Sequence, residues 1–109
     1  MKKRTLPFTK DNLERISERF PTPFHIYDEM AIRANARELL KAFSWNPGFK
    51  EYFAVKATPN PFILKILKSE GFGTDCSSLP ELLLSEKAGI AGDEIMFSSN
   101  DTPACEFKK

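Results

Sequence analysis

The chain has 109 residues, about the size of one small domain, and 41% of them are hydrophobic and 28% charged. Its 16 basic and 15 acidic residues give a net charge of +1, so charge offers no reason to expect nucleic acid or an anionic membrane as a partner. The opening "MKKR" is not followed by the apolar core of a signal peptide. No segment approaches the roughly 20 apolar residues of a membrane span. The composition is typical of a soluble globular protein.

The two cysteines, Cys76 and Cys105, have neither CxxC spacing nor nearby histidines. A zinc site is therefore not expected, and no metal is predicted. We expect both thiols to be reduced and the protein to be cytoplasmic.

A short helix and a strand are predicted at the start of the chain. Leu13, Ile16 and Phe20 recur at helical spacing behind Thr9, a residue type that caps helices. The segment "TPFHIYD", residues 22–28, alternates between apolar and polar side chains, as a strand with one buried face does.

The next segment predicts a second, longer helix. Asp28 can cap it, and apolar residues then recur along one stripe as far as Phe43. The sequence "NPG" at residues 46–48 ends the pattern.

From residue 51 onwards one unit recurs: a short apolar strand, a polar residue, a proline and a helix. "YFAVK" leads to Asn60-Pro61, which suit the cap and the first position of a helix. "FGTDC" leads to "SLPE", in which Ser78 and Glu81 have the spacing of a capping box. "EIMFSS" leads to Pro103, and a third helix is predicted in "ACEFKK". Strands that alternate with helices predict an α/β fold with a parallel sheet.

The three βα units are too few to form a complete barrel. Three units are fewer than a (β/α)₈ barrel contains, since such a barrel takes roughly 250 residues. A three-stranded sheet would also leave an edge unpaired. We therefore expect the chain to be the N-terminal part of something longer, and the intact mass of the native polypeptide would test this.

Lys56 ends the first strand of the repeat. If Phe53 and Val55 face the helices, Lys56 faces the other side, and the small Ala54 leaves space there for a flat ligand. In barrels of parallel strands the chemistry lies at the C-terminal ends of the strands, where Asp75 ends the next one. A nucleophilic lysine needs a pKa below its usual value of about 10.4, which an apolar pocket provides. The alternative is an ordinary charge at a strand end.

The segments "YFAVKATPNPFILKIL", "GFGTDCSSLPEL" and "DEIMFSSN" resemble the start of the barrel in the fold-type III pyridoxal-phosphate-dependent decarboxylases. The resemblance runs from about Thr22 to the end of the chain. Its most specific parts are "AVKA-x-PNP" and, about twenty residues later, "D-x-x-S-x-x-E". Members of this family act on diaminopimelate, ornithine, arginine or carboxynorspermidine, and the chain is most similar to the diaminopimelate branch.

The resemblance implies roles for five residues. Lys56 matches the lysine that covalently holds pyridoxal phosphate in the family. Asp75 matches an acidic residue beside the cofactor, and Ala54, Ser78 and Glu81 match positions that line or support the site. For Glu81, the capping box is a structural alternative to a role in the site.

The resemblance also implies a domain plan. Residues 1–28 would belong to a second, β-rich domain, and residues 29–109 would form the first βα units of an incomplete pyridoxal-phosphate-binding (β/α)₈ barrel. The substrate would be a small molecule, an amino acid, and the full-length protein would be a homodimer. Much of the family site comes from later strands and from a second subunit, so we expect the 109 residues alone to be inactive.

Two other classes of function stay open. One is a non-catalytic barrel that binds pyridoxal phosphate. The other is a regulatory protein that has kept the fold and lost the chemistry. Binding of the cofactor would distinguish them.

Overall fold

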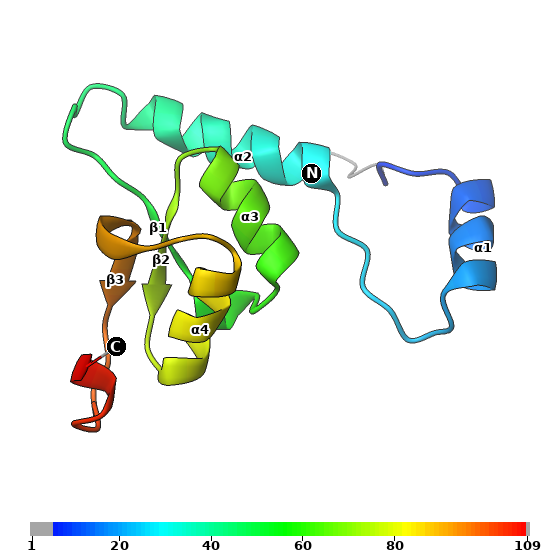
Figure 1. The fold of residues 1–109 in the computed structure, drawn as a ribbon. Helices are drawn as coiled ribbons and strands as arrows, with labels where there is room; N and C mark the ends of the chain where they lie inside the picture. Colours follow the sequence, from blue (N-terminus) through cyan, green and yellow to red (C-terminus); the bar gives the residue numbers. More distant parts are fainter. Residues whose placement is uncertain (1–5, 109) are drawn as a thin grey trace.

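The computed structural model describes residues 6–108, which form a three-stranded sheet with helices beside it (Figure 1). The helices are α1 (Lys10–Arg19), α2 (Glu29–Ala42), α3 (Pro61–Ser69) and α4 (Leu79–Lys87), and the strands are β1 (Tyr52–Ala54), β2 (Gly73–Cys76) and β3 (Ile95–Phe97). Three short 3₁₀ turns join them: η1 (Val55–Ala57), η2 (Gly92–Glu94) and η3 (Glu106–Lys108). Among residues 6–108, no helix is both long and apolar enough to cross a membrane.

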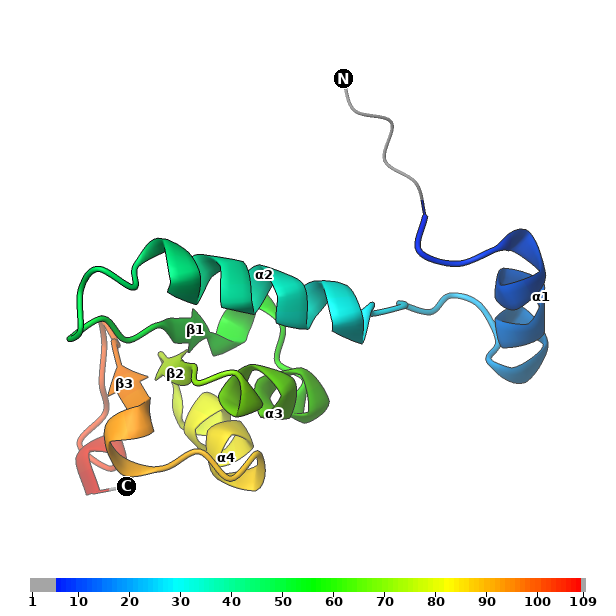
Figure 2. The same cartoon turned by 90° about the horizontal axis from the view of Figure 1, so that it is seen from above.

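The sheet is parallel, with the order β1-β2-β3. Figure 2 shows α2, α3 and α4 grouped along one face of this sheet. No described segment covers the other face, which is called the open face below. The predicted α/β fold with parallel strands and helical connections is therefore confirmed.

The core lies between the sheet and the helices. Val55, Leu64 and Cys76 are fully buried there, and Phe53 packs against the core from β1. Alternation along β1 therefore places Phe53 on the helix side and Ala54 on the open face. The condition stated from the sequence, that Phe53 and Val55 face the helices, is therefore met.

The predicted helix starts are confirmed by their caps. The side chain of Thr9 accepts a hydrogen bond from the Asn12 N–H at 3.2 Å, and that of Asp28 accepts one from the Ala31 N–H at 3.1 Å. Asn60 does the same for the third helix, with Pro61 at its first position. Each cap satisfies an N–H group that has no partner within its helix.

Two predicted elements are wrong. Residues 22–28 form no strand, because no described segment runs beside them to complete a hydrogen-bonded ladder. The helix predicted from Ala104 is replaced by the single turn η3, because the Glu106 N–H donates to the Pro103 carbonyl three residues back, the 3₁₀ pattern. Residue 109 lies outside the described residues.

The N-terminal segment extends away from the sheet. In Figure 2, α1 lies well to one side of α2, and an extended connection joins them. None of the residues of α1 is buried. The assignment of residues 1–28 to a second domain stays a prediction, and residues 1–5 lie outside the described part of the chain.

An ion-pair cluster joins α2 to the end of α3. Glu70 follows α3, and its side chain is only 8% exposed. Its Oε2 accepts a hydrogen bond from Arg37 Nε at 2.7 Å, and its Oε1 accepts one from Arg33 Nη1 at 2.8 Å. These bonds from Arg37 and Arg33 lower the pKa of Glu70 to about 2. The cluster therefore favours the folded state while Glu70 is ionised.

Replacing Glu70 with glutamine should destabilise the fold at neutral pH. The folded-state pKa of about 2 lies below the ordinary value of 4.5, so the stabilisation is complete above about pH 5 and is lost as the pH falls towards 2. In urea unfolding, the midpoint of Glu70→Gln should lie below that of the wild type at pH 7, and the difference should shrink over this acid range. Glu38→Gln, on the exposed side of α2, is the control and should show no such trend. A constant difference at every pH would contradict the prediction.

Candidate functional site

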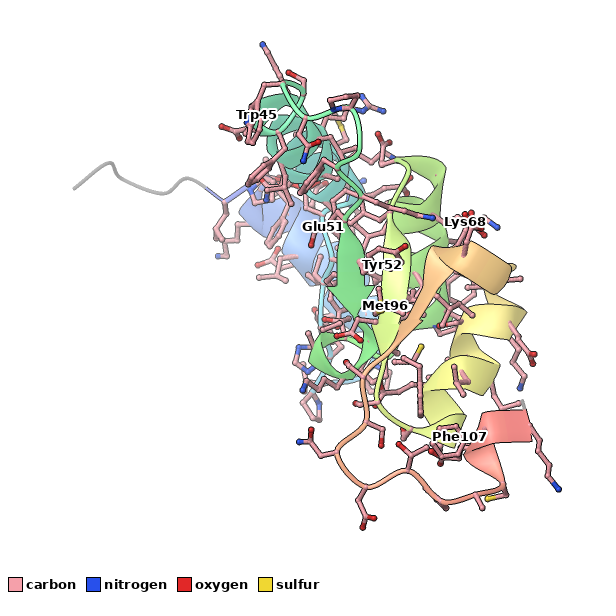
Figure 3. The ribbon with its side chains drawn as sticks, turned by 90° about the vertical axis from the view of Figure 1, so that its left-hand side faces the viewer. Trp45, Glu51, Tyr52, Lys68, Met96 and Phe107 are labelled. Atoms are coloured by element: carbon pink, nitrogen blue, oxygen red, sulfur yellow. The ribbon has the colours of Figure 1, made fainter. Side chains whose placement is uncertain are left out.

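The carboxyl ends of the three strands place a row of side chains on the open face. Ala54 of β1 pairs with Asp75 of β2, and Asp75 pairs with Met96 of β3. Figure 3 looks onto this face, where Tyr52 and Met96 are labelled. Paired residues of parallel strands point to the same side of a sheet, so Ala54, Asp75 and Met96 share one surface. This register places Asp75 beside Ala54, two residues before Lys56. A role of Asp75 beside the cofactor stays a prediction.

Lys56 lies just beyond this row. The sequence predicted that it ends the strand, but β1 ends at Ala54 and Lys56 lies in the 3₁₀ turn η1. The turn forms because the Thr58 N–H donates to the Val55 carbonyl at 3.1 Å, which directs the chain away from the sheet towards α3. Lys56 is exposed and makes no hydrogen bond or ion pair with any of residues 6–108. Its amine is therefore available to a ligand.

The carboxylate of Asp75 is held by a residue that the sequence analysis missed. Ser98 Oγ donates a hydrogen bond to Asp75 Oδ1 at 2.5 Å, across 23 residues of sequence. The same serine donates its N–H to the Cys76 carbonyl at 2.9 Å and so extends the pairing of β2 with the chain beyond β3. The only signal in the sequence is alternation, because Ser98 follows Met96 by two residues and so falls on the same face.

Ser78 and Glu81 lie at the start of α4, directly after β2. Ser78 is the cap residue as predicted, but the predicted capping box is wrong. Ser78 Oγ donates to Glu81 Oε1 at 3.2 Å instead of accepting from the backbone, and Glu81 Oε2 accepts from the Ser77 N–H at 2.9 Å. Because the hydroxyl is turned towards the carboxylate, it does not cap the helix. Glu81 thus fixes the turn before α4, and its role in binding a cofactor stays a prediction.

A second carboxylate, also missed, caps α4 in place of Ser78. Glu106 Oε1 accepts a hydrogen bond from the Leu79 N–H at 3.1 Å, across 27 residues of sequence. A negative charge is favourable at the N-terminus of a helix, where the peptide dipoles leave a partial positive charge. This contact joins η3 to the turn that follows β2.

Cys76 is next to Asp75 but faces the other side of the sheet. It is fully buried, with its Sγ 3.3 Å from Ser85 Oγ, and burial raises the pKa of its thiol. A buried thiol with a raised pKa is a poor nucleophile, because only the thiolate reacts readily. Cys76 is therefore part of the core.

A thiol reagent should distinguish the two cysteines. Iodoacetamide at pH 8 should leave Cys76 of the native polypeptide unmodified and should alkylate it once the chain is unfolded in urea. Peptide mass spectrometry checks both states, and Cys105, which is exposed, is the internal comparison. Rapid alkylation of Cys76 in the native state would contradict the burial argument.

The residues at this edge fit pyridoxal phosphate. A primary amine that can bond to an aldehyde carbon is available at Lys56. Ala54 contributes little bulk on the open face, which leaves room for a flat ring, and Asp75 supplies a carboxylate in the same row. The fold and the site together indicate the class of protein. It is an α/β protein whose parallel sheet has a lysine directly after the carboxyl end of its first strand.

The chain matches the family described as "pyridoxal-dependent decarboxylase, pyridoxal binding domain" over residues 29–108. It therefore belongs to this family. The family expected from the sequence and its cofactor, pyridoxal phosphate, are thus confirmed.

Curated relatives extend the comparison. The chain is 49% identical to Protein TabA of Pseudomonas amygdali pv. tabaci over 96 residues, which cover 88% of this chain and 23% of that protein. It is 36% identical to diaminopimelate decarboxylase of Methanothermobacter thermautotrophicus over 87 residues, 79% of this chain and 20% of the relative. The chain thus spans only about a fifth to a quarter of these relatives.

One solved structure has the same fold. The crystal structure of lysine decarboxylase from Selenomonas ruminantium superimposes with a TM-score of 0.75 at 21% sequence identity, and the match covers 93% of this chain and 26% of that one. At this identity the match supports the fold alone. It agrees with the expected N-terminal part of a (β/α)₈ barrel.

Proposed function

We propose that the protein carrying these residues is a pyridoxal-phosphate-dependent decarboxylase of an α-amino acid, with Lys56 as the residue that holds the cofactor. The observation that carries the proposal is the position of Lys56. Lys56 directly follows β1 at the carboxyl edge of the sheet, its amine has no partner among residues 6–108, and it belongs to the segment that matches the pyridoxal-binding family. In barrels of parallel strands this edge is where catalytic residues gather.

When bound, pyridoxal phosphate supplies an electron sink for the electron pair that remains on the α-carbon as carbon dioxide leaves. Lys56 would hold the cofactor through its amine at the carboxyl edge of the sheet. Ala54 would leave room for the ring. The carboxylate of Asp75 would stabilise a protonated nitrogen atom of the cofactor or the substrate. Ser78 and Glu81 hold the turn after β2, so the edge of the site keeps its shape.

Diaminopimelate is the substrate that we propose. Several curated relatives are named diaminopimelate decarboxylase, and they are 29–36% identical to the chain. Other relatives widen the range, since one from Niallia circulans, 35% identical over 83 residues, is named L-glutamyl-[BtrI acyl-carrier protein] decarboxylase. Ornithine, arginine and carboxynorspermidine are the alternatives. We propose that the native protein is a cytoplasmic homodimer.

Two measurements on the native polypeptide test the proposal. The first incubates it with pyridoxal phosphate, reduces the mixture with borohydride and locates the modified residue by peptide mass spectrometry, which should be Lys56. The second measures release of carbon dioxide from diaminopimelate, ornithine, arginine, carboxynorspermidine and lysine.

The outcomes separate the alternatives. A modified Lys56 together with release from diaminopimelate supports the proposed cofactor site and substrate, and release from another amino acid alone corrects the substrate. A modified Lys56 without any release of carbon dioxide would indicate a non-catalytic cofactor-binding protein. The absence of a modified Lys56 would overturn the proposed site.

A further inference from the structure

Ser98 and Asp75 form a side-chain contact at the carboxyl edge of the sheet. Ser98 Oγ lies 2.5 Å from Asp75 Oδ1, within the range of hydrogen bonds from a hydroxyl to a carboxylate. Asp75 Oδ2 accepts no hydrogen bond from any of residues 6–108. One oxygen of the carboxylate is thus held, and the other is available.

The backbone of both residues is held by hydrogen bonds between neighbouring segments of the sheet. Asp75 is in register with Ala54 on one side and Met96 on the other. Ser98 is held two residues beyond Met96, because its N–H donates to the Cys76 carbonyl at 2.9 Å. The hydroxyl therefore starts from a fixed backbone position.

A carboxylate on its own has little orientational preference. The terminal torsion of an aspartate is broad, so an unrestrained Asp75 would sample many directions of its two oxygens. The hydrogen bond from Ser98 to Oδ1 restricts this torsion, so Oδ2 samples fewer directions at the carboxyl edge of the sheet, where Lys56 follows β1. Site groups held in advance in this way bind a ligand with a smaller loss of conformational entropy.

We propose that Ser98 is a positioning residue of the cofactor site and acts by orienting the carboxylate of Asp75. This inference rests on the proposed function, in which Asp75 faces the cofactor held by Lys56. It adds to the site a residue that directly follows the third strand.

A double-mutant cycle on the native polypeptide tests the inference. The variants are Ser98→Ala, Asp75→Asn and the two combined, and the quantity measured is the Kd for pyridoxal phosphate, obtained by absorbance titration. Ser98→Ala should weaken binding about tenfold, as expected for a hydrogen bond to a charged group. Asp75→Asn should weaken it at least as much, and adding Ser98→Ala to Asp75→Asn should cause little further loss, because Ser98 acts through Asp75.

Two controls separate positioning from general damage. Ser98→Thr keeps the hydroxyl and should restore a Kd close to that of the wild type. Ser99→Ala makes the same change one residue later, at a side chain that forms no hydrogen bond with Asp75, and should leave the Kd unchanged. Urea unfolding of each variant shows whether it is folded.

The results distinguish this inference from the function on which it rests. If the wild type binds pyridoxal phosphate at Lys56 while Ser98→Ala changes only the unfolding midpoint, Ser98 merely links two strands and the inference is wrong. Fully additive effects of Ser98→Ala and Asp75→Asn would also overturn it. If the wild type itself shows no borohydride-trapped cofactor, the proposed function fails, and the inference fails with it.

Discussion

Replacing Lys56 with alanine should abolish covalent attachment of pyridoxal phosphate and lower decarboxylation by about a thousandfold or more. The reason is that Lys56 supplies the proposed bond between protein and cofactor. The neighbouring row on the open face consists of Ala54, Asp75 and Met96, and none of these side chains carries an amine. The measurements are the amount of borohydride-trapped adduct and the rate of carbon dioxide release from diaminopimelate.

Two further variants make the result specific. Lys56→Arg keeps the positive charge, but a guanidinium is effectively always protonated and is not a nucleophile here, so this variant should be as inactive as Lys56→Ala. Lys65→Ala removes an exposed lysine on α3, whose Nζ lies 6.0 Å from the centre of the Phe62 ring, and should retain activity. Full activity in Lys56→Ala, or a trapped adduct on Lys65, would contradict the assignment.

The helix starts could be predicted because their causes are local. Thr9, Asp28 and Asn60 each bond to an N–H two or three residues away, so the contact follows from sequence spacing. The predicted strand at residues 22–28 failed for the opposite reason. Its alternation was correct for a strand, but a strand also needs a neighbour, and alternation does not say whether one exists.

The site could be predicted as far as backbone register determines it. Strand alternation placed Ala54 on the side away from the helices, and the order of the βα units placed Asp75 at the end of the next strand, as the register shows. The contacts of Asp75 with Ser98 and of Leu79 with Glu106 could not be predicted, because they depend on side-chain directions across 23 and 27 residues. The same limit applies to Ser78 and Glu81, whose spacing was right and whose hydrogen bonds differ from the expected pattern.

Gly73→Ala should destabilise the fold by about 3 kcal/mol, a large effect for the addition of one methyl group. Gly73 pairs with Tyr52 in the sheet, and the Tyr52 ring crosses it so that the hydroxyl can donate to the Asp93 carbonyl at 2.9 Å. A Cβ at Gly73 would lie 2.4 Å from the Glu94 carbonyl oxygen and 2.7 Å from Tyr52 Cδ1. The Glu94 oxygen is a backbone atom of η2, directly before β3, so relief requires η2 and the start of β3 to move away from β2.

The urea unfolding midpoint of the native polypeptide measures this loss. Gly48→Ala is the matched control, because its Cβ would meet only Asn46 Oδ1, at an ordinary 3.5 Å, and its midpoint should stay near that of the wild type. Combining Gly73→Ala with Tyr52→Ala removes the clash with the ring but not the clash with Glu94. The double variant should therefore remain clearly less stable than Tyr52→Ala alone. Equal midpoints for Gly73→Ala and Gly48→Ala would show that β2 and β3 pack less tightly at this point than the structure indicates.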